Sequence, residues 1–209
     1  MNRLNQLPRQ VLLAPIVVLQ WLAATAFAPD VRLGIAAVAI GLGAVSIAVD
    51  PAFFKRMLTP SIAHVFLGLA AAVVMVVATY GLYPIIAHAI PYVALSTRHL
   101  YVDFARIPHP SILILLFAGL IVIGEEVLWR GVVQEAAQSV IKRWWAIPVS
   151  ALIYGLSHAL IGSPLLTVVA VICGVFWSFL RARSGSLLPA LIAHLVWDIT
   201  ILTHPLITQ

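Results

Sequence analysis

Three charged side chains interrupt one of the most apolar stretches of this sequence. The run IVIGEEVLWRG, residues 121–131, contains Glu125, Glu126 and Arg130. The chain as a whole is 63% hydrophobic and 9% charged. A charged side chain at the centre of a bilayer costs about 2.5–3.5 kcal/mol even on the gentlest insertion scale, so these groups must be paired and must face a protein interior or a water-filled cavity. We therefore treat them as a predicted functional site.

Helix geometry separates the roles of the two glutamates. Glu126 and Arg130 are four residues apart, so they share one face of a helix and can form an ion pair. Glu125 points about 100° away from that face and has no partner on its own helix. A desolvated, unpaired carboxylate suits a general base. The spacing therefore predicts a structural Glu126–Arg130 pair and a catalytic Glu125. The alternative is that all three residues form one buried ionic cluster that stabilises helix packing.

Two further apolar segments carry histidines at helical spacing from other polar residues. In ALIYGLSHAL, Tyr154 precedes His158 by one turn, and in LLPALIAHLVWDIT, His194 and Asp198 lie four residues apart on one face. A lone histidine in a span is commonly a hydrogen-bonded packing residue. Two histidines, an unpaired Glu and an Asp on three helices instead indicate a site.

The whole chain has the composition of a membrane protein. Helices that cross a bilayer need about 20 residues, a chain of this length has room for about seven of them, and seven apolar segments can be drawn in the sequence. We predict an all-α fold, a polytopic membrane helical bundle of about seven transmembrane helices, with residues 1–209 forming a single integral membrane domain. The predicted spans are 11–28, 33–49, 61–86, 111–139, 145–162, 165–180 and 187–203.

The basic residues follow the positive-inside rule if the N-terminus is inside. The net charge of +5 is then explained by topology, and we expect the lipid bilayer, and no nucleic acid, as a partner. Segment 11–28 resembles a signal peptide, but Pro29 follows it directly, so we interpret it as a retained first span. The inner loops hold Arg3, Arg9, Lys55, Arg56, Lys142, Arg143, Arg181 and Arg183, and the outer loops hold Arg32, Arg98 and Arg106.

The polar residues of the three helices recur in the order and spacing of a known family. The sequence reads Glu125-Glu126-x-x-x-Arg130, Tyr154-x-x-x-His158 and His194-x-x-x-Asp198. This series resembles the EExxxR, FxxxH and HxxxN/D motifs of the CAAX-processing and bacteriocin-processing intramembrane proteases (the CPBP or Abi family, which includes the type 2 CAAX prenyl proteases). The resemblance covers a protease core of about residues 110–200, and the first 110 residues carry no motif.

The resemblance implies hydrolysis of a peptide bond within the membrane, in a membrane-associated or C-terminally anchored peptide or protein. On the family's pattern, Glu125 and His158 activate a water molecule, while His194 and Asp198 stabilise the oxyanion. Members are often called metalloproteases, and a metal-free, glutamate-type mechanism is also proposed for the family. We favour the metal-free version and expect no cofactor; the alternative is a Zn²⁺ held by Glu125, His158 and His194.

Two positions depart from the family's pattern. Tyr154 stands where Phe is typical, which adds a hydroxyl group that must find a hydrogen-bond partner. Asp198 stands where Asn is common, and an ionised Asp cannot donate a hydrogen bond to an oxyanion. Asp198 is therefore either protonated or orients His194.

Two functions from other classes remain open. Buried Glu, His and Asp side chains also form proton relays, which would suit a proton- or ion-coupled transporter, although the chain shows no internal repeat. A catalytically silent immunity or chaperone partner on the same scaffold is the other alternative. The small chain, without extra domains, suggests a multipass protein of a prokaryotic cytoplasmic membrane; its substrate and oligomeric state do not follow from the sequence.

Overall fold

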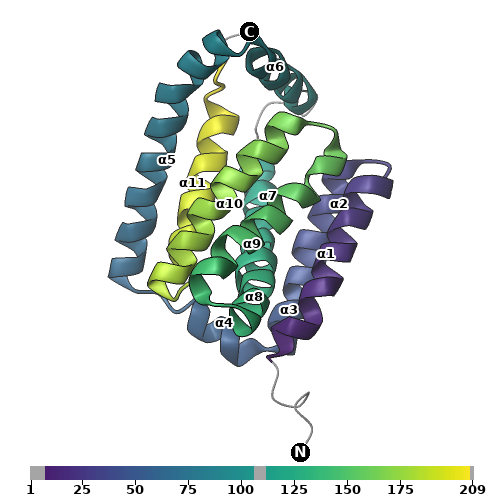
Figure 1. The fold of residues 1–209 in the computed structure, drawn as a ribbon, viewed down its shortest axis with the longest axis vertical. Helices are drawn as coiled ribbons and strands as arrows, with labels where there is room; N and C mark the ends of the chain where they lie inside the picture. The colour runs from purple at the N-terminus through teal and green to yellow at the C-terminus, as the bar shows by residue number, and fades with distance from the viewer. Residues whose placement is uncertain (1–7, 106–111, 208–209) are drawn as a thin grey trace, which may run out of the picture.

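The computed structural model describes residues 8–105 and 112–207, and these residues form helices joined by short connections, with no strand among them. The all-α fold is therefore confirmed. Figure 1 shows the helices gathered into one bundle, with α5 beside α11 at one edge and α1 beside α2 at the other.

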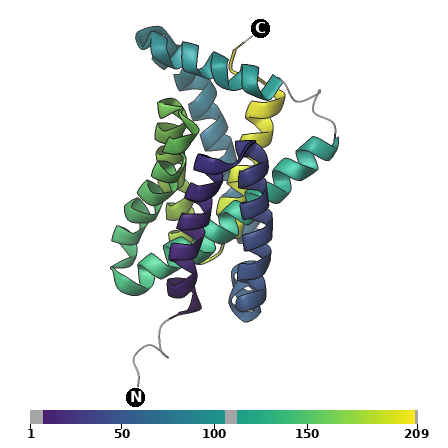
Figure 2. The ribbon, with the colours of Figure 1, turned by 90° about the vertical axis from the view of Figure 1, so that its right-hand side faces the viewer.

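The first part of the bundle is a hairpin of two apolar helices. Helix α1 spans Arg9–Phe27, and it is followed by a continuous helical run made of α2 (Val31–Ala37), the π-helical stretch η2 (Val38–Leu42) and α3 (Gly43–Val49). The short helix α4 (Pro51–Met57) then leads to the long helix α5 (Ile62–Ala89). Helix α6 (Pro91–Ala105) lies across the end of the bundle where α11 ends (Figure 2).

The second part contains the predicted site. Helix α7 (Ile112–Glu126), the π-helical stretch η3 (Val127–Val133) and α8 (Gln134–Val140) form one continuous run, which crosses the bundle obliquely (Figure 2). Helix α9 (Arg143–Ser157) ends in the short 3-10 helix η4 (Ala159–Ile161), and α10 (Pro164–Ser184) and α11 (Leu188–Thr203) follow.

Local sequence explains where several helices begin and end. Asp50, Ser61 and Ser163 are N-caps whose side chains accept hydrogen bonds from backbone N–H groups of the first turn. Gly162 and Gly185 have φ values of 86° and 72°, a left-handed conformation that glycine adopts without the steric cost of a Cβ atom. Gly162 ends η4 and Gly185 ends α10, so each turn redirects the chain into the next element.

Within the described residues, five helices are long and apolar enough to cross a membrane. The chain is therefore an integral membrane protein, whereas the count of seven spans and the inside position of the N-terminus stay predictions. Two predicted spans are not among the five: 111–139, which falls on the run α7–η3–α8, and 187–203, which falls on the 16-residue helix α11. The five are Arg9–Phe27, Val31–Val49, Ile62–Ala89, Arg143–Ile161 and Pro164–Ser184.

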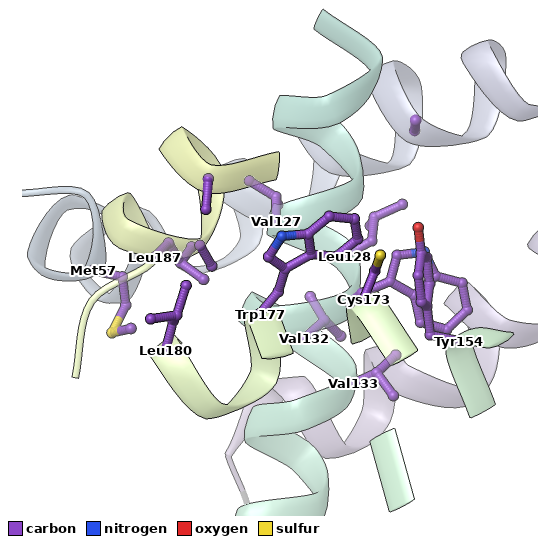
Figure 3. Packing of buried hydrophobic residues seen from close by; sticks show 14 of the residues in the cluster. Met57, Val127, Leu128, Val132, Val133, Tyr154, Cys173, Trp177, Leu180 and Leu187 are labelled. Carbon is purple, nitrogen blue, oxygen red and sulfur yellow. The ribbon is translucent and has the colours of Figure 1, made fainter. Parts of the chain in front are cut away.

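The core surrounds the middle of the oblique run. Helices α9 and α10 pack along each other, as do α5 and α11, and η3 contacts α1. Trp21, Trp129 and Trp177 are among the largest fully enclosed side chains. In Figure 3, apolar residues of η3 lie among side chains of α9 and α10: Val127, Leu128, Val132 and Val133 near Tyr154, Cys173 and Trp177.

Candidate active site

The two glutamates end α7 inside the bundle. Glu125 is 8% exposed and Glu126 is 1% exposed. Gly124, the residue before them, permits this depth, because a Cβ atom at Gly124 would lie only 2.2 Å from the carbonyl oxygen of Ala39 in η2. The helix that follows is π-helical, a local irregularity that is frequent at functional sites.

Glu126 forms the ion pair that its spacing predicted and a second contact that the spacing did not predict. Its Oε1 atom lies 3.1 Å from Nη1 of Arg130 and 2.9 Å from Nδ1 of His194. The other oxygen, Oε2, has no hydrogen-bond partner in the described part of the chain. Glu126 therefore ties α11 to the oblique run through a single shared oxygen.

Arg130 lies between two aromatic rings. Its guanidinium carbon is 4.5 Å from the ring centre of Tyr154 and 5.0 Å from that of Trp177. Cation–π contacts of this kind are worth about 2 kcal/mol or more when the cation is desolvated, and Arg130 is 1% exposed. Glu126 and the two rings together compensate for the burial of this charge.

Glu125 has a partner on another helix. The hydroxyl of Tyr154 in α9 donates a hydrogen bond of 3.0 Å to Oε2 of Glu125. This partner lies on α9 and not on the helix of Glu125, as the spacing predicted. The same contact gives the buried Tyr154 hydroxyl the hydrogen-bond partner that it needs. One glutamate thus pairs with α9 and the next with α11.

His158 lies at the C-cap of α9, just beyond the last helical residue. Its Nδ1 atom is 2.8 Å from the carbonyl oxygen of Tyr154. Because a carbonyl oxygen only accepts, Nδ1 carries the proton in this hydrogen bond, and neutral His158 then has an unprotonated Nε2. The centre of its ring lies 4.6 Å from the ring centre of Tyr154 and 5.5 Å from that of Trp21. An imidazole with a free Nε2 lone pair can accept a proton.

His194 is held on three sides. Besides the contact of Nδ1 with Glu126, its Nε2 lies 3.6 Å from Oδ1 of Asp198, and its ring stacks on Trp177 with 3.6 Å between ring centres. The Asp198 side chain is 28% exposed, whereas that of His194 is 4% exposed. Asp198 is thus the most accessible of the four predicted catalytic residues.

The predicted residues form two connected chains of contacts. Glu125, Tyr154 and His158 form the first chain, which joins the oblique run to α9. Glu126, His194 and Asp198 form the second, which joins the run to α11. The two chains meet at the adjacent glutamates, Glu125 and Glu126. The structure therefore brings together groups from all three predicted motifs.

The side chains named as a Zn²⁺ alternative do not form a metal site. Across residues 8–105 and 112–207, no group of three or more His, Cys, Asp or Glu side chains is arranged to hold a metal ion. The contact of His158 Nδ1 with a backbone carbonyl leaves Nε2 of that ring open, but both nitrogens of His194 face carboxylates. Glu125, His158 and His194 therefore do not fit a His₂Glu ligand set in this arrangement.

Sequence reasoning missed the aromatic residues that frame the site. Trp177 stacks on His194, and Trp129 packs edge-on against Tyr154 with 5.2 Å between ring centres. Tryptophans in apolar runs are typical of an ordinary core, so their spacing alone does not reveal them. The one indication in the sequence is Arg130, because a buried cation binds the faces of aromatic rings.

Two shallow apolar hollows lie elsewhere on the molecule. One is lined by Gln20, Val38 and Leu42 among others, and the other by Leu33, Ile40 and Phe117 among others. None of the candidate site residues lines either hollow.

The fold and the site define a polytopic helical membrane protein whose buried Glu, His and Tyr side chains meet where its helices cross. Residues 107–200 match the family model described as type II CAAX prenyl endopeptidase Rce1-like. This part of the chain is therefore similar to that family of endopeptidases, and the resemblance inferred from the three motifs is confirmed. No curated protein and no solved structure matches the chain significantly.

Proposed function

We propose that this protein is an intramembrane endopeptidase that uses Glu125 and His158 to activate water without a metal ion. The observation that carries the proposal is the hydrogen-bonded chain Glu125–Tyr154–His158. It gives a buried carboxylate a fixed orientation and links it to the helix end that carries an imidazole with a free nitrogen. Both groups belong to the segment that matches the endopeptidase family.

In the proposed first step, a water molecule attacks the carbonyl carbon of the scissile peptide bond. A new C–O bond forms, the carbonyl π electrons move to oxygen, and Glu125 accepts the proton that the water loses. Nε2 of His158 accepts a hydrogen bond from the same water and orients its lone pair. The product of this step is a tetrahedral intermediate with a negatively charged oxygen.

In this proposal, His194 stabilises that oxygen. When both ring nitrogens are protonated, Nδ1 donates to Glu126 and Nε2 can donate to the oxyanion. Asp198, 3.6 Å from Nε2, orients the ring in this proposal and does not itself donate to the oxyanion. In the second step the C–N bond breaks, and Glu125 returns its proton to the leaving amine.

The substrate class that we propose is a membrane-anchored peptide, cleaved within or at the surface of a prokaryotic cytoplasmic membrane. Two probes represent this class: a fluorescence-quenched peptide with a farnesylated C-terminal CAAX sequence, and a quenched peptide anchored by a transmembrane helix. The purified full-length chain is reconstituted in liposomes with each probe. Cleavage of either probe by the wild type supports the proposal.

Substitution then connects cleavage to the site. Glu125→Gln, His158→Ala and His194→Ala should each reduce cleavage by at least about 100-fold, the usual scale for removing an acid–base or oxyanion group. Asp30→Asn, in the exposed turn before α2, serves as the control and should cleave at the wild-type rate. Full cleavage by Glu125→Gln would refute the mechanism. Ion-dependent uptake in the same liposomes without cleavage would instead favour the transporter alternative.

A further inference from the structure

We infer that Tyr154 is a positioning residue that holds both members of the water-activating pair, and this inference rests on the proposed function. Its side-chain hydroxyl donates to Oε2 of Glu125 at 3.0 Å, and its backbone carbonyl accepts from Nδ1 of His158 at 2.8 Å. One residue of α9 thereby sets the position of Glu125 relative to His158. The sequence alone indicated only that the hydroxyl needs a partner.

The ring of Tyr154 is confined on several sides, so the hydroxyl has a fixed direction. Arg130 covers one face of the ring, Trp129 packs edge-on at 5.2 Å between ring centres, and His158 packs at 4.6 Å. A Cβ atom at Gly174 would lie 3.1 Å from Cδ1 of Tyr154, so the backbone of α10 is close as well. With the residue 5% exposed, the hydroxyl has little room to turn away from the carboxylate.

The hydrogen bond assigns different tasks to the two oxygens of Glu125. Oε2 is occupied by the Tyr154 hydroxyl, which leaves Oε1 to accept the proton of the water. A carboxylate held at one oxygen loses fewer rotational states when the reaction begins, and this pre-organisation increases the rate of the chemical step. Substrate binding does not require the same restraint.

The two contacts made by Tyr154 can be separated by a single substitution. Tyr154→Phe removes the hydroxyl and so the contact with Glu125. It keeps the ring that packs against Arg130 and His158, and it keeps the backbone carbonyl that accepts from Nδ1. Because Phe is the typical residue of the family's FxxxH motif, the variant is compatible with the fold.

The test compares Tyr154→Phe with the control variant Tyr101→Phe. The Tyr101 hydroxyl lies outside the site and donates to a backbone carbonyl of α11 at 2.9 Å, so each variant loses one donated hydrogen bond. Using whichever probe the wild type cleaves, Tyr154→Phe should lower kcat about tenfold and leave KM unchanged, because a hydrogen bond to a charged group is lost. Tyr101→Phe should leave kcat and KM unchanged. Both variants should show similar melting temperatures.

A double substitution distinguishes positioning from general support of the fold. If the hydroxyl acts through Glu125, adding Tyr154→Phe to Glu125→Gln should not reduce the residual cleavage further. An additional tenfold loss in the double variant, an unchanged kcat in Tyr154→Phe, or a melting temperature well below that of Tyr101→Phe would each overturn the inference. In all of these cases Glu125→Gln still cleaves at least about 100-fold more slowly than the wild type, and the proposed function stands. Full activity of Glu125→Gln would remove the proposed function and this inference together.

Discussion

Gly124 is the position at which a single methyl group should do the most damage to the site. It lies where α7 crosses the π-helical stretch η2, directly before Glu125. A Cβ atom there would lie 2.2 Å from the carbonyl oxygen and 2.4 Å from the carbonyl carbon of Ala39. Both atoms belong to backbone, so no side-chain rotation relieves the contact. Gly124→Ala must therefore separate the two helices.

The separation can be derived from the contact distance. Real Cβ contacts essentially never fall below 3.0 Å, so the crossing must open by roughly 0.8 Å to accommodate the 2.2 Å contact. Overpacking of this kind costs about 1–3 kcal/mol of folding free energy. A displacement of about 1 Å at reacting groups can lower the rate about 100-fold. Because Glu125 is the next residue, we expect both effects.

A glycine on the same helix provides the matched control. At Gly119 the nearest atom to a new Cβ would be Cδ1 of Leu195 at 3.6 Å, an ordinary van der Waals contact. Both Gly→Ala substitutions gain the same helix propensity, up to about 1 kcal/mol, so their difference isolates the contact with Ala39. Thermal unfolding in detergent and cleavage in liposomes are measured for both. Equal stability and equal cleavage rates for the two variants would refute the reasoning.

Three other predictions concern the parts of the site around Glu125. Arg130→Met leaves Glu126 buried without its cation and should lower the free energy of unfolding by about 3–5 kcal/mol, whereas adding Glu126→Gln should recover part of the loss; denaturant titration in detergent measures both. Trp177→Leu removes the ring stacked on His194 and should lower kcat about tenfold, while Trp177→Phe should retain most activity; cleavage kinetics test this. Prolonged chelation with o-phenanthroline should leave cleavage unchanged, and a loss restored by added Zn²⁺ would contradict the metal-free mechanism.

The sequence was informative where the physical cause is local. Hydrophobic segments predicted an all-helical membrane fold because a bilayer requires long apolar helices. The four-residue spacing placed Arg130 beside Glu126, and the ion pair of 3.1 Å is present. Burial of the Tyr154 hydroxyl required a partner, which is Glu125.

The spacing of residues along each helix did not predict the contacts between helices. The bond between Glu126 and His194 depends on how the oblique run crosses α11, and the helical period contains no information about tilt. The π-helical stretch η3 also shifts the side chains beyond Glu126 relative to an α-helical pattern. Similarly, the helical period does not show that α9 ends just before His158, which is its C-cap within the candidate span Arg143–Ile161.

The role of Asp198 illustrates the same limit. The spacing placed it on the same face as His194, which the 3.6 Å distance between Oδ1 and Nε2 agrees with. Which ring nitrogen it would face depended on whether another group occupied Nδ1, and that group is Glu126 from a distant segment.

The most direct test of the central claim, hydrolysis by water activated at Glu125, is mass spectrometry of the cleaved probe in heavy-oxygen water. The wild type should give two fragments, with one heavy oxygen atom in the new C-terminal carboxyl group, and Glu125→Gln should give at least about 100-fold less of both fragments. Fragments of equal yield from Glu125→Gln, or a wild-type protein that moves ions across the liposome membrane and leaves both probes intact, would contradict the account.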